Sequence, residues 1–244
     1  MIGAALVTLP ALAFAIPISI TNPTATFSNA SPADHTNYSA VDGSTTNNQV
    51  RWGVPTPYNN ANTGGEQSGL KFDVTPPPIN GDTEVPFDLG TLTHFNFEVT
   101  IPTTSTTDLA FGFDIFGQTL NFGFSLGIDE TPNGGNAANC AFQPVLTRSC
   151  PDQITFPNAF STTSFEHDGL IYTLKLLGFG PDADHIQNGF ITQEDQANTT
   201  DLWAVITTQR IGVPEPNGLL LMALGLLALG GTVQLRRKRA AKKA

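Results

Sequence analysis

Positive charge is scarce over most of this chain. Of its 11 Lys and Arg residues, six lie in the last nine positions, which leaves five in the first 235 residues against all 21 Asp and Glu. The first 235 residues therefore carry a net charge near −16. An acidic body repels phosphate groups, and no basic patch with interleaved aromatic residues offsets this repulsion, so a nucleic-acid partner is excluded.

Cysteines and catalytic motifs are equally few. The only cysteines are Cys140 and Cys150, with nine residues between them. In an exported protein this spacing favours a disulfide, whereas a pair of buried free thiols would suit a cytosolic chain. Two cysteines without clustered histidines do not make a zinc site. The chain has no nucleophile elbow, zinc-protease helix or phosphate-binding loop, and no carboxylate pair stands out, so we expect a protein that is not an enzyme.

The N-terminus lacks the basic residue that normally begins a signal peptide, but it has the other parts. Residues 2–16 are apolar or small, and "AFA" at 13–15 fits a cleavage site after Ala15. We therefore expect a signal peptide over residues 1–15, with the true start of translation upstream, and an extracellular domain over residues 16–212.

The C-terminus combines three short features. Asn217 to Leu235 are free of charge, and as a helix they would reach about 28 Å, enough to cross the hydrocarbon core of a membrane. The basic residues that follow would stay in the cytoplasm, which places the acidic body outside. The two prolines in Val213 to Pro216 predict an extended hinge at the membrane face, accessible to a protease.

This tail, residues 213–244, resembles the PEP-CTERM sorting signal of bacterial proteins that are processed by an exosortase. "VPEP", a short apolar helix and "RRKR" occur in that order at the end of the chain. The resemblance implies membrane insertion, processing near the Pro-Glu-Pro element and then a location at the cell surface or outside the cell. A permanent single-pass anchor is the alternative. The sorting residues are Val213, Pro214, Glu215, Pro216, Arg236, Arg237, Lys238 and Arg239.

The body between the two ends predicts an all-β domain. Short apolar runs alternate with turn residues, and no sustained helical period occurs. Residues 109–126 predict a hairpin with its turn near Gly117, and Asp168-Gly169 predicts a second one. Further strands are expected in "ATFSN", "VRWGV", "SGLKFDV" and "DLWAVITTQRI". Many short strands at this spacing favour one antiparallel β-sandwich, layered like a jelly roll or an immunoglobulin domain.

The segment "THFNFEVTI" predicts a half-buried strand. Alternation places Phe95 with Thr93, Phe97, Val99 and Ile101 on the inner face, and His94, Asn96 and Glu98 on the outer face at steps of about 6.6 Å. We expect these three to form a supporting polar face. A pair of metal ligands or an acid/base dyad is the alternative.

The same segment carries a second resemblance. Thr93, His94 and Asn96 fit the Thr-His-x-Asn signature of the THxN family of PEP-CTERM proteins, whose domain is called choice-of-anchor K. "RWGVP", "QSGLKF", "DETPN", the two cysteines and "YTLKLLGF" follow the order found in that group, over most of residues 26–210. The resemblance implies a location and a fold class rather than a biochemical activity.

Two ligand hypotheses remain open at this point. No cofactor is expected, although loop carboxylates at Asp129, Glu130, Asp182 and Asp184 are of the type that Ca²⁺ prefers. We expect a structural or interaction role at the cell surface or in a biofilm matrix, with exosortase and the membrane as partners and exopolysaccharide as a further one. The alternative is a carbohydrate-binding module in which Trp52 and Tyr58 stack on sugars.

Overall fold

The computed structural model describes residues 15–56, 66–100, 104–131, 137–142, 150–156 and 163–211. The chain separates into two units, Met1–Thr208 and Gln209–Ala244, and only residues 209–211 of the second are described. No helix within the described ranges is long and apolar enough to span a membrane. The expected signal peptide, apart from Ala15, and the expected helix over 217–235 lie outside these ranges.

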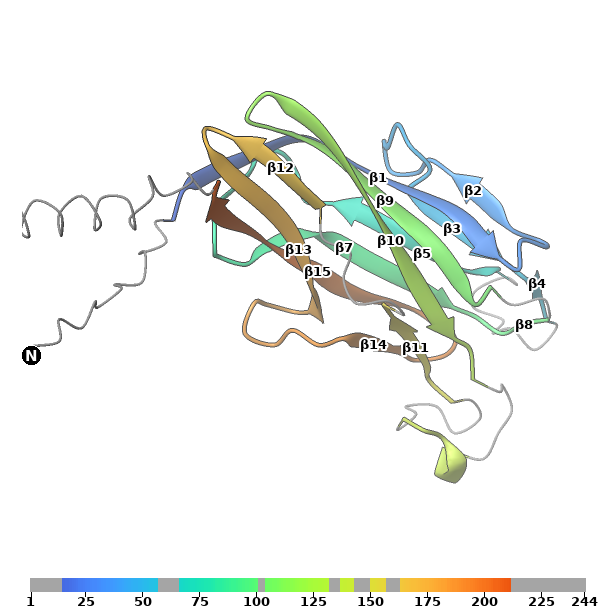
Figure 1. Cartoon of the computed structure of the whole chain (residues 1–244). Helices are drawn as coiled ribbons and strands as arrows, with labels where there is room; N and C mark the ends of the chain where they lie inside the picture. The colour runs from blue at the N-terminus through green and yellow to red at the C-terminus, as the bar shows by residue number, and fades with distance from the viewer. Residues whose placement is uncertain are drawn as a thin grey trace, which may run out of the picture. The chain divides into compact units, whose positions relative to one another are not determined.

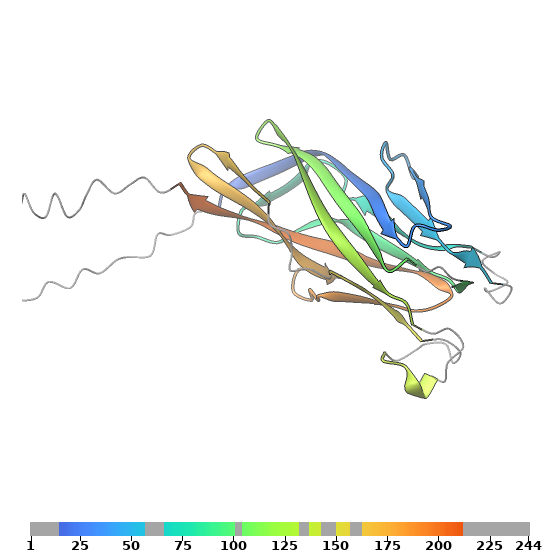
Figure 2. The same ribbon diagram turned by 45° about the vertical axis from the view of Figure 1, so that its right-hand side comes forward.

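The described body is built from β-strands in two large sheets and one small one, and every strand pair with a described register is antiparallel. The first sheet has, in spatial order, β14 (Gly189–Thr192), β11 (Asp152–Thr155), β10 (Gln118–Asp129), β9 (Thr106–Ile115), β1 (Pro17–Ser31) and β6 (Ile79–Asp82). The second has β12 (Thr163–His167), β13 (Leu170–Gly180), β15 (Gln196–Arg210), β7 (Phe87–Asn96), β5 (Ser68–Val74), β3 (Gln49–Trp52) and β2 (Asn37–Ser39). A two-stranded sheet pairs β4 (Val54–Pro55) with β8 (Val99–Thr100), and a short 3-10 helix, η1, covers Ala137–Asn139. The prediction of an all-β antiparallel fold is confirmed, and its layering is sandwich-like (Figures 1 and 2).

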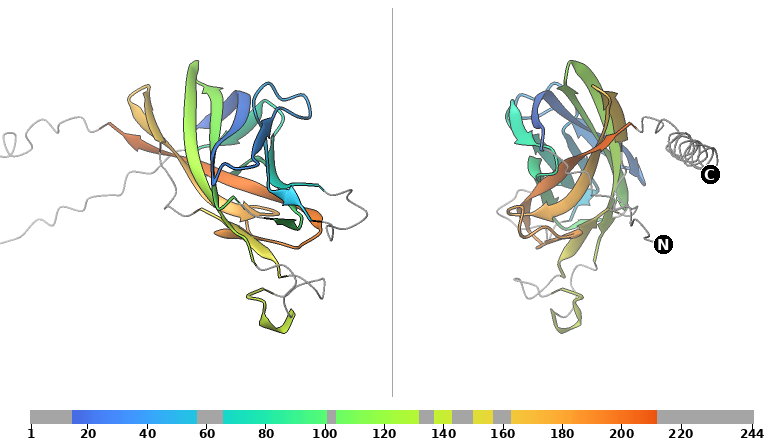
Figure 3. Two further views of the ribbon diagram at one scale, coloured as in Figure 1. Left: turned by 90° about the vertical axis from the view of Figure 1, so that its right-hand side faces the viewer. Right: turned by 60° about the vertical axis from the view of Figure 1, so that its left-hand side comes forward.

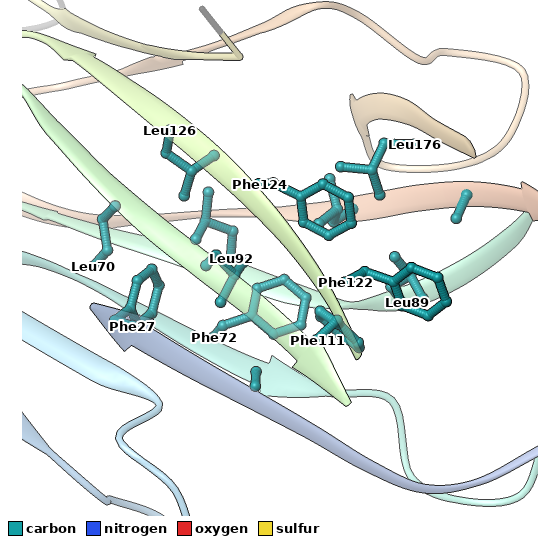
Figure 4. Close-up of a cluster of buried hydrophobic side chains, with 14 of the residues drawn as sticks. Phe27, Leu70, Phe72, Leu89, Leu92, Phe111, Phe122, Phe124, Leu126 and Leu176 are labelled. Atoms are coloured by element: carbon teal, nitrogen blue, oxygen red, sulfur yellow. The ribbon is translucent and has the colours of Figure 1, made fainter. Parts of the chain in front are cut away.

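The core lies between the two large sheets. Phe72 of β5 and Phe111 of β9 meet edge to face, with their ring centroids 5.2 Å apart, and each is at most 1% exposed. Figure 4 shows these rings among apolar side chains from both sheets. Alternating phenylalanines of the 109–126 hairpin, Phe111, Phe113, Phe122 and Phe124, are buried in this core. Burial of such rings is the main stabilising contribution to the domain.

Both predicted hairpin turns are present. Asp168 and Gly169 join β12 to β13 with φ values of 47° and 73°, the left-handed pair that a two-residue hairpin turn requires. Phe116 and Gly117 join β9 to β10 in the same way, with φ values of 51° and 74°.

The strand that carries the Thr-His-x-Asn motif differs from the prediction. Leu89 and Gly90 form a bulge in β7, because Trp203 pairs with Asp88 whereas the preceding Leu202 pairs with Gly90. One extra residue reverses the alternation beyond it. His94 and Asn96 therefore face the interior and are fully buried, and Phe95 lies outside beneath the Arg51 guanidinium, whose carbon is 3.5 Å from the ring centroid. The expected outward polar face at these two residues is wrong.

The motif strand is also shorter than expected. β7 ends at Asn96, and the chain then forms the separate short strand β8. Phe97 and Val99 are buried as expected, Glu98 lies between them outside any strand, and Ile101 lies beyond the described residues.

The predicted disulfide between Cys140 and Cys150 is present. It joins the segment that carries η1, which projects beyond the ends of β10 and β11 (Figure 3), to the residue two positions before β11. We expect the Cys140→Ser, Cys150→Ser double variant to lose about 2–3 kcal/mol of unfolding free energy, because the bond closes a short loop in the unfolded chain. Urea unfolding monitored by intrinsic fluorescence would measure this, and chemically reduced wild type should match the variant. Equal stability of all three samples would contradict the expectation.

Ile16 and Thr208 lie at the same end of the strands, beside the neighbouring residues Thr83 and Glu84. The backbone N–H of Ile16 donates to Thr83 Oγ1, and the backbone N–H of Thr208 donates to a carboxylate oxygen of Glu84. At the other end of β15, Gln196 pairs with Asn96. Twelve residues of strand separate Gln196 from Thr208, or about 40 Å. The interior residues near Asn96 thus lie far from the point where the chain leaves the domain.

Candidate functional site

A cluster of buried polar side chains lies between the sheets at the end of β7. His94 and Asn96 of β7 come from one sheet, and Asp152 of β11 and Thr192 of β14 come from the other. All four are fully buried. Glu130 lies directly after β10, and Glu194 lies between β14 and β15, close enough for its charge to interact with those of Asp152 and Glu130. These six residues form what we call the inter-sheet cluster.

Hydrogen bonds orient the imidazole and amide of this cluster. His94 Nδ1 lies 2.8 Å from Thr192 Oγ1, and the Asn96 side-chain amide donates to the Thr192 carbonyl at 3.1 Å. Thr192 Oγ1 in turn donates to the Asp152 carbonyl at 3.4 Å. A Thr192 hydroxyl that donates to this carbonyl accepts a hydrogen bond from His94 Nδ1–H, and in that tautomer the imidazole keeps a lone pair on Nε2.

Two of the carboxyl groups are held by donors from neighbouring residues. Trp52 Nε1 donates to Glu130 Oε1 at 3.2 Å, and the backbone N–H of Thr131 donates to Asp152 Oδ1 at 2.7 Å. Thr131 Oγ1 donates to the carbonyl of the disulfide-bonded Cys150 at 2.7 Å, so Thr131 contacts both Asp152 and the residue two positions before it.

Burial dominates the protonation of these groups. It raises the pKa of Glu130 and of Asp152, and the Asp152 charge raises that of Glu130 further. Burial, followed by the charges of Asp152 and Glu130, raises the pKa of Glu194 to about 9. Burial lowers the pKa of His94 to about 3, and the Arg51 charge acts in the same direction. The imidazole is thus neutral, and the three carboxyl groups strongly resist ionising together.

Several polar atoms of the cluster have no hydrogen-bond partner in the described structure. They are His94 Nε2, Asn96 Oδ1, Asp152 Oδ2 and both carboxyl oxygens of Glu194. Buried polar atoms are almost always paired, so five such atoms in one place are unusual. One ligand atom each from His94, Glu130 and Asp152 lie within 4.8 Å of one another. Imidazole nitrogen and carboxylate oxygen are donor atoms that could hold a metal ion.

The proposed sugar-stacking role of Trp52 is wrong. Its side chain is fully buried, stacks on His94 with 6.1 Å between ring centroids, and donates to Glu130. A ring enclosed in this way offers no face to a carbohydrate. Tyr58, the other half of the expected pair, lies outside the described residues.

The loop carboxylates considered for Ca²⁺ separate into two groups. Asp182 Oδ1 accepts hydrogen bonds from the backbone N–H of Asp184 and from His185, at 3.0 and 2.7 Å, in an exposed loop. Asp129 is exposed as well, and only Glu130 belongs to the buried cluster. The sorting residues, from Val213 to Arg239, lie outside the described ranges.

Asp152, Thr192 and Glu194 were not predicted from the sequence. Asp152 has one local signal, because it alternates with Ile154 and therefore shares the inward face of β11. For Thr192 and Glu194 no such signal exists. Thr192 enters the cluster because it pairs with Asp152 across the sheet, and Glu194 follows it by two residues in the connection to β15.

The C-terminal residues are similar to a known sorting motif. Residues 212–238 match the model of the PEP-CTERM protein-sorting motif. No curated protein matches the chain. The motif implies an exported protein that an exosortase system sorts at the membrane and that then reaches the surface.

Proposed function

We propose that this protein is a non-catalytic domain displayed on the cell surface or released into the extracellular matrix after its C-terminal tail is processed. The match of residues 212–238 to the sorting motif carries this proposal. Processing falls at Pro214 to Pro216, between the domain and the apolar segment, and exopolysaccharide of the matrix is the partner class that we propose for the mature domain.

The disulfide supports a location outside the cytoplasm. The Cys140–Cys150 bond is of a kind that forms and persists in oxidising compartments. The N-terminal Ile16 and the C-terminal Thr208 of the domain are both fastened to the 83–84 segment. Both ends of the domain therefore lie about 40 Å from the other end of β15.

A non-catalytic role agrees with the enclosure of the inter-sheet cluster. His94, Asn96 and Asp152 are fully buried and Glu194 is 3% exposed, so these side chains are closed to a macromolecular substrate. We also propose membership of the THxN, choice-of-anchor K group, in which Thr93, His94 and Asn96 would be retained for their place in the core.

The first test is the intact mass of the protein recovered from the outer surface and the medium of the native bacterium. We expect a C-terminus between residues 213 and 217. In Glu215→Ala, or after deletion of residues 236–243, we expect full-length protein to accumulate in the inner membrane, because the address read by the exosortase is damaged.

Glu166→Ala is the matched control, since Glu166 is an exposed carboxylate on β12. It should be processed and released like the wild type. Release of the Glu215→Ala and tail-deleted variants at wild-type levels would contradict sorting by this tail. A C-terminus at Ala244 in protein found only in inner-membrane fractions would show a permanent anchor instead.

A further inference from the structure

We propose that the inter-sheet cluster is a binding site for one divalent transition-metal ion, Zn²⁺ or Mn²⁺. The ligands are His94, Glu130, Asp152 and Glu194, and the side-chain oxygen Oδ1 of Asn96 is an additional donor. Ligand atoms of His94, Glu130 and Asp152 already lie within 4.8 Å of one another. Donor atoms around a tetrahedral ion with metal–ligand distances near 2.1 Å are about 3.4 Å apart, so the two most distant of these atoms need to approach by up to about 1.4 Å.

The imidazole is prepared to act as a ligand. Its Nδ1–H is directed at Thr192 Oγ1, which fixes the ring and leaves the Nε2 lone pair directed into the cluster without a partner in the described structure. Metal-binding histidines characteristically donate their other ring N–H to such a neighbour. Stacking of Trp52 on the ring restricts its rotation further.

The carboxyl groups also lack the cation that buried carboxylates require. Glu194 is 3% exposed, and neither of its carboxyl oxygens has a described hydrogen-bond partner. The Arg51 guanidinium does not supply the charge, because it lies over Phe95 on the outer face of β7 and donates to the Gln67 carbonyl at 2.9 Å. A divalent ion would neutralise the carboxylates and use the unpaired oxygen atoms at once.

The donor set points to the class of ion. One imidazole nitrogen among carboxylate oxygens is typical of zinc and manganese sites, whereas Ca²⁺ takes oxygen ligands alone. Because the protein supplies four or five ligands in an enclosed place, the ion would be structural. It would link β7 of one sheet to β11 and the end of β10 in the other.

The experiment uses the full-length chain, carrying a tag without histidine, in mild detergent. After removal of metal with a chelator and exchange into metal-free buffer, Zn²⁺, Mn²⁺, Ca²⁺ or Mg²⁺ is added singly. We expect about one Zn²⁺ or Mn²⁺ per chain after gel filtration, measured by elemental mass spectrometry. The melting temperature should rise by about 5 °C or more at saturating ion.

Isosteric variants separate binding from folding. Glu194→Gln and His94→Gln should each lose most of the bound metal and most of the rise in melting temperature. Without metal, Glu194→Gln should melt no lower than wild type, because it removes a buried carboxyl group that has no partner. The matched controls are Glu166→Gln, and His185→Gln at the exposed imidazole beside Asp182, and both should bind metal like wild type.

Three results would overturn the proposal. The first is a metal content well below one ion per chain, with no change in melting temperature for any ion. The second is binding that survives in folded Glu194→Gln and His94→Gln. The third is a response to Ca²⁺ or Mg²⁺ with none to Zn²⁺ or Mn²⁺, which would overturn the assignment to a transition metal. Each readout is independent of tail processing, so failure here would leave the proposed sorting untouched.

Discussion

Gly90→Ala is expected to lower the free energy of unfolding by about 2–5 kcal/mol, measured by urea denaturation. Gly90 has φ of +149°, a conformation that L-residues rarely adopt, and an added Cβ would clash with the Asp73 carbonyl oxygen and lie 2.6 Å from Cε1 of Phe72. Both backbone strain and overpacking oppose the substitution. The large effect is expected because neither the central strand β5 nor the core ring of Phe72 can move away freely.

Gly123→Ala is the matched control on β10. A Cβ at Gly123 would meet nothing within 4 Å, and its φ lies outside the positive range. This variant should change stability by less than about 1 kcal/mol. Equal losses of stability in the two variants would contradict the expectation that backbone strain and overpacking at Gly90 cause the effect.

The Gly90 bulge also determines what lies inside the domain. Without the extra residue in β7, the strand would keep a uniform alternation, and His94 and Asn96 would turn outward with Phe95 inward. If Gly90→Ala folds by losing the bulge, His94 should become accessible to a histidine-modifying reagent. In the wild type it should stay protected, whereas the exposed His185 should react.

The metal-free protein is expected to lose about 2–4 kcal/mol of unfolding free energy between pH 6.5 and pH 9. Burial and the neighbouring charges of Asp152 and Glu130 raise the pKa of Glu194 to about 9, against an ordinary value of 4.5. In this window the folded chain keeps a proton on Glu194 that the unfolded chain has released. Stability therefore falls as pH rises, and the raised pKa of Glu130 acts in the same direction.

Below pH 6.5 His94 gives the free energy of unfolding the opposite pH dependence. The pKa of His94 is lowered to about 3, so below pH 6.5 the imidazole binds a proton in the unfolded chain but not in the folded chain. The free energy of unfolding therefore decreases as the pH falls through this range. Urea midpoints of chelated protein at several pH values would measure both slopes. Glu194→Gln should flatten the fall between pH 6.5 and 9, whereas Glu166→Gln should leave it unchanged. A flat or rising profile in the wild type would contradict the expectation.

A bound metal would reverse this pH dependence. Metal binding requires ionised carboxylates and a neutral imidazole, so affinity increases as pH rises towards neutrality and above. The same three carboxyl groups that weaken the empty domain at pH 8 would then stabilise the occupied one. After export, the ion would bind to the cluster and stabilise the domain when the surrounding medium contains it.

The hairpins, the disulfide and the sorting motif could all be predicted from short-range features of the sequence. The two hairpins follow from period-two alternation and from turn residues such as Asp168-Gly169, whose preferred conformation is a property of two neighbouring residues. Cys140 and Cys150 were close enough in sequence to predict their bond, and the order of proline, apolar and basic segments at the C-terminus predicted the sorting motif. Each of these signals comes from residues close together in the chain, so it can be recognised in the sequence alone.

Long-range packing determines which residues share the interior at the end of β7. One bulge at Gly90 reverses the alternation that places His94, and no local pattern marks it, because it depends on how β15 and β5 pair with β7. Trp52 of β3 is buried beside the same residues and stacks on His94. Asp152 and Thr192 face each other across β11 and β14, and Glu130 reaches the same place from the first sheet. Their meeting is a consequence of two sheets packing together, which involves residues far apart in the chain, and that is why alternation within single strands could not reveal it.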